Sequence, residues 1–151
     1  MILAIDIGGT FIKFELVDDD FKISNQSKVS TPPTLDDFWL TLENIVSSHK
    51  DIISGIAIAC PGEINSKRGF VFKGGLIPYL TAIPLGSRLT KTVQLPVKVI
   101  NDADAAALAE ARYGSLQDLD CGAALVLGTG VGLGIVSQKD LLSPLSVTQY
   151  L

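Results

Sequence analysis

Short apolar stretches separated by turn signals fill the first thirty residues. Residues 2–7 are apolar apart from Asp6 and too few for a helix, and Gly8 and Gly9 follow, which predicts a buried strand entering a tight turn. Residues 11–17 partly alternate up to an acidic turn at 18–20, and the more polar residues 21–30 precede a proline pair. This pattern predicts a hairpin and a third strand antiparallel to the second.

A helix is predicted where the apolar spacing changes after this proline pair. Thr34 is a residue type that caps helix N-termini, and Asp36 and Asp37 fall in the first turn, where the helix dipole favours negative charge. His49, near the expected end, is predicted to cap carbonyls or face solvent rather than act as a catalyst. The apolar residues that recur at helical spacing, and that include the predicted core aromatics, are Leu35, Phe38, Trp39, Leu42, Ile45 and Val46.

The rest of the chain alternates strands and helices. Strands are predicted at 55–59 and 97–100, a helix begins at Pro84, and an alanine-rich helix covers 103–113. The loop after residue 60 is rich in glycine and carries a short strand at 70–72. Two apolar strands, 123–127 and 131–136, form a final hairpin. This order predicts an α/β fold with a mixed sheet, and the last hairpin is interpreted as the start of another domain.

Composition narrows the class of protein. With 151 residues and 47% hydrophobic content the chain can bury a core, and a formal charge of -4 offers no basic surface for a nucleic-acid backbone. No basic leader precedes the first strand and no apolar run reaches the roughly 18 residues of a membrane span, so a cytoplasmic location without membrane contact is expected. Cys60 and Cys121 lie in hydrophobic stretches without metal-ligand spacing and are predicted to be buried free thiols.

The first turn has the chemistry of a phosphate site. Asp6 ends a strand beside Gly8 and Gly9, whose backbone N–H groups can approach an anion, and the Thr10 hydroxyl follows. The ammonium of Lys13 can reach the same phosphate, and Asp6 can hold a hydrated Mg²⁺. The turn is not a P-loop, because it opens a strand and no Lys-Ser or Lys-Thr follows. An ordinary hairpin turn is the alternative interpretation.

A second polar pair, Asn101 and Asp102, joins an apolar strand to a helix, where ligands collect in α/β sheets. Simple capping of the helix is the alternative. The glycine-rich run at 128–134 fails the dinucleotide-binding pattern, because its third glycine is out of place and no helix follows. A second phosphate-binding hairpin turn within this run remains open.

The order of these segments resembles a known family. The runs DIGGTFIK at 6–13, ACPGEIN at 59–65, NDADAAALAE at 101–110 after LPV at 95–97, and LGTGVG at 127–132 are similar to those of ROK (repressor, open reading frame, kinase) sugar kinases, glucokinase among them. The resemblance covers about residues 2–138. It implies the ribonuclease-H-like, actin-like ATPase fold, with a mixed five-stranded sheet in a first domain at 1–117 and the first hairpin of a second such domain at 118–151.

The resemblance also assigns roles. Asp6, Gly8, Gly9, Thr10 and Lys13 would bind ATP phosphates with Mg²⁺, and Thr129 and Gly130 would form the second phosphate motif. Asp102 would act as general base toward a hydroxyl of a hexose or N-acetylated amino sugar, with Asn101 and Gly69 binding the sugar.

The chain also departs from the family pattern. The family's downstream sugar motif, zinc motif and adenine pocket have no counterpart, so an N-terminal fragment that lacks kinase activity on its own is expected. A non-catalytic sugar-binding or subunit-pairing remnant is one alternative. A ROK repressor lacking its DNA-binding domain is another, disfavoured because no helix-turn-helix precedes residue 6. Self-association through the apolar hairpin is also expected.

Overall fold

The structure is a computed structural model that describes residues 1–127 and 130–142. It forms two compact units, Met1–Asn101 and Asp102–Leu151. The division falls before the alanine-rich helix, whereas the boundary predicted from the sequence lies at 117–118, after it. That domain boundary stays a prediction. No helix within the described residues is both long and apolar enough to cross a membrane.

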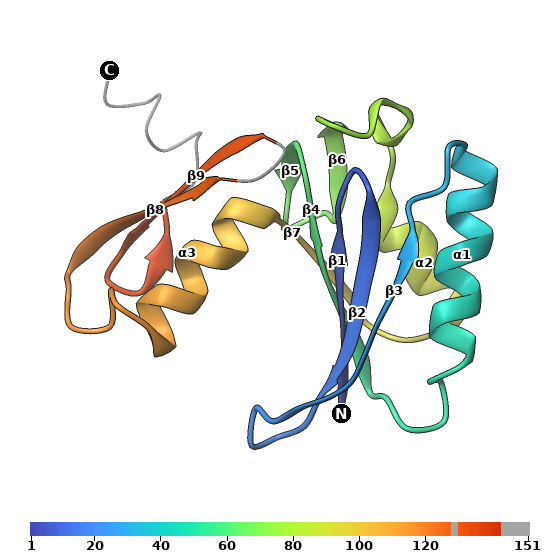
Figure 1. The fold of residues 1–151 in the computed structure, drawn as a ribbon, viewed down its shortest axis with the longest axis horizontal. Helices are drawn as coiled ribbons and strands as arrows, with labels where there is room; N and C mark the ends of the chain where they lie inside the picture. The colour runs from blue at the N-terminus through green and yellow to red at the C-terminus, as the bar shows by residue number, and fades with distance from the viewer. Residues whose placement is uncertain (128–129, 143–151) are drawn as a thin grey trace. The chain divides into compact units, whose positions relative to one another are not determined.

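The first unit is built on the predicted five-stranded mixed sheet, in the order β3-β2-β1-β4-β7 (Figure 1). Strand β1 (Ile2–Ile7) pairs antiparallel with β2 (Phe11–Val17), which pairs antiparallel with β3 (Ile23–Ser30). On its other side β1 pairs parallel with β4 (Gly55–Cys60), and β4 pairs parallel with β7 (Val97–Asn101). Three parallel strands therefore share one carboxyl edge.

Two helices, α1 (Leu35–Ser47) and α2 (Leu85–Val93), cover one face of this sheet (Figure 1). As predicted, the Asp37 N–H donates to the Thr34 side chain at the start of α1, and His49 Nδ1 lies 2.7 Å from the Ile45 carbonyl oxygen. The predicted core aromatics Phe38 and Trp39 are buried. Alternate residues of β1 and the apolar stripes of both helices therefore form one core.

The glycine-rich segment between β4 and α2 contains more structure than its sequence predicts. A two-stranded sheet pairs β5 (Glu63–Asn65) with β6 (Phe70–Lys73), and a 3₁₀ helix, η1 (Pro78–Leu80), follows. Only the second strand was expected. Three-residue elements carry too little periodicity to be recognised, and contacts outside the segment, such as the bridge from Val71 to Ile83, help to hold it.

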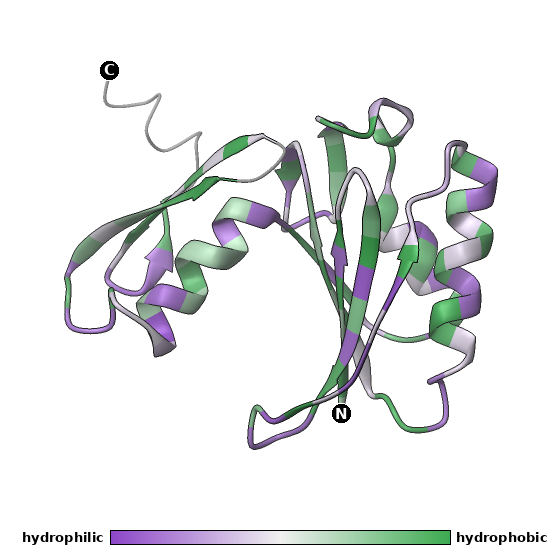
Figure 2. Ribbon diagram, viewed as in Figure 1, coloured by the Kyte–Doolittle hydropathy of each residue, from purple (hydrophilic) through white to green (hydrophobic). Residues whose placement is uncertain are grey.

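The second unit consists of a helix and a small antiparallel sheet. Helix α3 (Asp102–Tyr113) precedes β8 (Cys121–Leu127), β9 (Val131–Ser137) and β10 (Asp140–Leu141), in the sheet order β10-β9-β8. The buried face of α3 is made of alanines, coloured pale green in Figure 2. Gly132 and Gly134 of β9 lie so close to Ala103 and Ala107 that an added Cβ would collide with them. Small residues on both sides thus allow close packing.

One cysteine prediction is wrong. Cys60 is buried in the core, as expected, but Cys121 is exposed. It is the first residue of β8, in which exposed and half-buried residues alternate, and it falls on the exposed set. The hydrophobic surroundings in sequence did not reveal which face of the strand it occupies.

Candidate active site

Three predicted segments meet at one edge of the first unit's sheet. Strands β1, β4 and β7 are parallel neighbours, so the turn after β1, the loop after β4 and Asn101 at the end of β7 all lie at their carboxyl edge. With strands about 4.8 Å apart, β1 and β7, which flank β4, are about 10 Å apart. Ligands of α/β proteins bind at such an edge.

The turn after β1, here called the phosphate turn (Gly8–Thr10), is closed by a hydrogen bond from the Gly8 N–H to the Phe11 carbonyl oxygen, 3.0 Å long. Gly9 and Thr10 are exposed, and among the residues that the structure describes their N–H groups have no hydrogen-bond partner. Two backbone donors and a hydroxyl therefore belong to adjacent exposed residues, and successive backbone N–H groups in a turn can bind an anion.

Gly9 is required neither by backbone conformation nor by space inside the protein. Its φ lies outside the left-handed region that favours glycine, and a Cβ added to it would make only an ordinary contact, 3.5 Å from the Leu76 Cβ. The usual reasons for glycine in a hairpin turn are thus absent. A residue without a side chain leaves room for a ligand at the exposed N–H groups.

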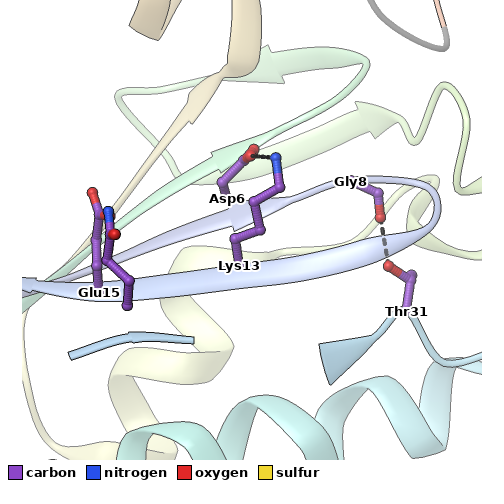
Figure 3. A network of polar contacts seen from close by, with 6 residues as sticks. Asp6, Gly8, Lys13, Glu15 and Thr31 are labelled. Atoms are coloured by element: carbon purple, nitrogen blue, oxygen red, sulfur yellow. Dashed lines mark hydrogen bonds and ion pairs between the residues drawn. The ribbon is translucent and has the colours of Figure 1, made fainter. Parts of the chain in front are cut away.

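Lys13 lies opposite Asp6 in the ladder between β1 and β2, and the two side chains form an ion pair with 3.5 Å between Lys13 Nζ and Asp6 Oδ2 (Figure 3). Both side chains are more than half exposed. Among the described residues no cluster of three or more candidate metal ligands occurs. A lone exposed carboxylate fits a hydrated Mg²⁺ whose other ligands are phosphate oxygens and water. To bind that ion, the Asp6 carboxylate would have to give up at least part of its ion pair with Lys13.

Asn101 fixes the loop after β4. Its Nδ2 donates to the Gly62 carbonyl oxygen over 2.8 Å. Gly62 has a φ of 102°, and any Cβ there would collide with the Lys73 carbonyl oxygen, so this residue must be glycine. This bond orients the Asn101 amide at the carboxyl end of β7.

Gly69 was predicted to contact the sugar, and the structure gives it a packing role. It is buried, has a φ of 61°, and accepts a 2.8 Å hydrogen bond from the Gly86 N–H at the start of α2. The close approach of these two glycines joins the β5–β6 hairpin to the helix. Its contact with a sugar stays a prediction.

Asp102 is the first residue of α3, in the second unit. Its Oδ1 accepts a hydrogen bond from the Ala103 N–H over 2.9 Å, and the helix N-terminus favours its negative charge. Burial raises the pKa of Asp104 above its ordinary value, and the Asp102 carboxylate raises it further. A half-buried acidic pair thus occupies the first turn of the helix.

Of the second predicted phosphate motif, Thr129 lies outside the described residues. Gly130 is exposed and directly precedes β9. Both assignments stay predictions.

Comparisons with known proteins agree with this architecture. The ROK family model matches residues 2–145. The beta-glucoside kinase of Listeria monocytogenes serovar 1/2a is 35% identical over 93% of this chain and 48% of its own length. The N-acetylmannosamine kinase of Citrobacter koseri is 35% identical over 95% of this chain and 50% of its own.

A solved structure extends the likeness to three dimensions. The ROK family glucokinase from Streptomyces griseus, in complex with glucose and AMPPNP, matches with a TM-score of 0.82 and 33% identity, over 93% of this chain and 45% of that one. The chain spans about half the length of the curated relatives it matches.

The mixed five-stranded sheet and these structural relatives place the chain in the actin-like ATPase fold class, as predicted. Within that class, the chain belongs to the ROK family.

Proposed function

We propose that this chain supplies phosphate- and sugar-binding residues of an ATP-dependent sugar kinase. The observation that carries the proposal is Gly9: an exposed glycine, needed by neither conformation nor packing, between backbone donors that have no partner among the described residues. A phosphate bound at these N–H groups explains the absence of a side chain.

In the proposed phosphoryl transfer, Asp102 and Asn101 have separate roles. Asp102 accepts the proton of a sugar hydroxyl while the hydroxyl oxygen bonds to the γ-phosphorus of ATP, and the bond from that phosphorus to the bridging oxygen breaks to release ADP. Asn101, oriented by its bond to Gly62, holds the sugar. Positioning and charge neutralisation provide most of the catalysis in such reactions.

In this proposal Asp6 and Lys13 bind the nucleotide through its phosphates and its Mg²⁺. Asp6 would hold a hydrated Mg²⁺, which neutralises charge on the phosphates when bound. Lys13 is within reach of the same phosphates once its ion pair with Asp6 opens. Because both side chains are exposed, exchanging that ion pair for other partners costs little.

The substrate class is a hexose or an N-acetylated amino sugar. Relatives at similar identity are a beta-glucoside kinase and an N-acetylmannosamine kinase, and the structural relative holds glucose. We expect turnover to require a segment that corresponds to the other half of these relatives, so the 151-residue chain binds ligands without phosphorylating them.

Binding is tested on the chain itself by amide NMR. Titration with MgATP should shift the Gly9 and Thr10 amides, and titration with glucose, N-acetylmannosamine or a β-glucoside should shift those of Gly62 and Asn101. Gly9→Val places a side chain at the anion and should abolish the first response while sparing the second. Unchanged MgATP affinity in Gly9→Val contradicts the phosphate role.

Catalysis is tested in a chimera that joins residues 1–142 to the remaining half of the Listeria kinase. Asp102→Ala should lower kcat by about 10²- to 10⁴-fold with a small effect on the KM for ATP, as loss of a general base does. Asp118→Ala, at an exposed aspartate of the same unit, is the control. Full turnover in Asp102→Ala would leave Asp102 as a helix-capping residue and favour a non-catalytic role for the chain.

A further inference from the structure

Thr31, the residue that follows β3, makes two hydrogen bonds to the phosphate turn. Its Oγ1 donates to the Gly8 carbonyl oxygen over 2.6 Å (Figure 3), and its backbone N–H donates to the Thr10 carbonyl oxygen over 3.0 Å. One residue of a third strand thus holds the turn on both sides of Gly9.

The turn needs such support because of its backbone conformation. Two-residue hairpin turns are favoured when the first or both central residues have positive φ, since their twist then matches that of the strands. Neither Gly9 nor Thr10 has a positive φ. The intrinsic preference of the hairpin therefore does not favour this turn, and the two hydrogen bonds from Thr31 add to the single bond from the Gly8 N–H to the Phe11 carbonyl oxygen that closes it.

Thr31 is itself anchored to the core. The carbonyl oxygen of the next residue, Pro32, accepts a 2.6 Å hydrogen bond from the Tyr79 hydroxyl on η1. The Tyr79 ring lies 5.9 Å from that of Phe38, which is fully buried. Burial raises the pKa of Tyr79, so its phenol keeps the proton that it donates. The support of the turn thus runs from the core through η1 to Thr31.

We infer that Thr31 is a positioning residue that holds the phosphate turn in the conformation in which the Gly9 and Thr10 N–H groups are left without a partner among the described residues. Its effect on ligand binding rests on the proposed function, whereas its effect on the turn does not. Both donors would then be ordered before a phosphate binds, so the free energy of binding would not include the cost of ordering the turn.

The test compares four forms of the 151-residue chain by ¹⁵N NMR: wild type, Thr31→Val, Thr31→Ser and Thr92→Val. Valine matches threonine in shape and lacks the hydroxyl, and serine restores the hydroxyl. Thr92, an exposed residue of α2, also donates to a carbonyl oxygen, that of Arg88, so Thr92→Val is a matched control. Backbone order parameters are measured without ligand, and inorganic tripolyphosphate is then titrated.

Without ligand, Thr31→Val should lower the order parameters of Gly8, Gly9 and Thr10 from about 0.85 toward 0.6 and leave β1 and β4 unchanged. In the titration it should weaken tripolyphosphate binding about fivefold, the equivalent of one ordinary hydrogen bond. Thr31→Ser and Thr92→Val should behave like wild type in both measurements.

Two outcomes overturn the inference: a turn as well ordered in Thr31→Val as in wild type, or the same loosening of the turn in Thr92→Val. If tripolyphosphate shifts no amide of the turn even in wild type, the proposed phosphate role fails. The order parameters still decide whether Thr31 positions the turn.

Discussion

The glycines of the candidate site are of two physical kinds. Gly62 and Gly69 have positive φ values and backbone neighbours where a Cβ would lie, so the fold itself requires them. Gly9 has neither constraint, and the proposed phosphate would account for it. In the sequence all three appear as glycines after or between strands. The turn after β1 was predictable from its residue types, and its phosphate role stays a prediction, whereas the packing role of Gly69 depends on Gly86, a residue of another element.

The Asp104 side chain predicts a pH dependence of stability. Its folded pKa is raised above its ordinary value of 3.8, so the fold favours the protonated form. The resulting stability is present below that value and is lost as the pH rises through the folded pKa. Asp104→Asn removes this titration. The free energy of unfolding of Asp104→Asn, relative to that of wild type, should therefore increase as the pH rises from 3 toward 7. Urea unfolding measures the difference.

Asp118→Asn, at an exposed carboxylate, is the control for this comparison and should show no such trend. A difference between Asp104→Asn and wild type that is the same at every pH would mean that the substitution acts through packing rather than charge.

Elements with strong periodicity were predicted and those held by distant partners were not. Strand β1 coincides with the apolar run predicted at 2–7, and the buried residues of α1 belong to the predicted apolar stripe. Strand β5, helix η1 and strand β10 are two or three residues long, and pairing rather than local pattern defines β5 and β10. Thr31 escaped notice for the same reason, because strand register alone brings it to Gly8.

The contact between α3 and β9 predicts a sharp sensitivity to one methyl group. In Gly134→Ala the new Cβ would meet the Ala103 carbonyl oxygen and the Ala107 Cβ, which are fixed parts of the helix. Overpacking of this kind costs about 1–3 kcal/mol. Amide hydrogen exchange across β8 and β9 should accelerate accordingly.

Gly122→Ala, on the paired strand, provides the comparison. The atoms nearest to its Cβ belong to the Leu116 side chain, which can rotate away, so its effect should be smaller. Equal acceleration in the two variants would contradict the close packing of α3 on β9.

At the scale of the whole molecule, the sequence order predicted the mixed sheet and the hairpin that follows it. The hairpin has one face on α3, and its other face is apolar and exposed: Leu125, Leu127, Val131 and Leu133 are each more than half exposed. Helix α3 follows β7 directly in the sequence and packs on the hairpin, so the local pattern alone does not say on which side of α3 a boundary falls, and the boundary at 117–118 stays a prediction.

This exposed face predicts self-association of the 151-residue chain. Leu125 and Leu133 are cross-strand partners, so Leu125→Lys with Leu133→Glu replaces an apolar pair by an ion pair and keeps the hairpin. Sedimentation should show assemblies for wild type and a monomer for the double variant. Leu40→Lys, at an isolated exposed leucine of α1, should leave the assemblies intact. A wild type that sediments as a monomer at every concentration contradicts the prediction.

The division between the two units falls at a single peptide bond, between the proposed sugar-binding amide and the proposed base. Consecutive Cα atoms are about 3.8 Å apart across a trans peptide bond, whatever the units around them do. Asn101 and Asp102 therefore keep adjacent Cα atoms whatever the units do. Asn101 belongs to the same unit and the same sheet as the phosphate turn, so its place relative to that turn is fixed by the sheet. A sugar held by Asn101 would keep its place relative to this sheet, and one peptide bond would limit how far the proposed base could move from the sugar.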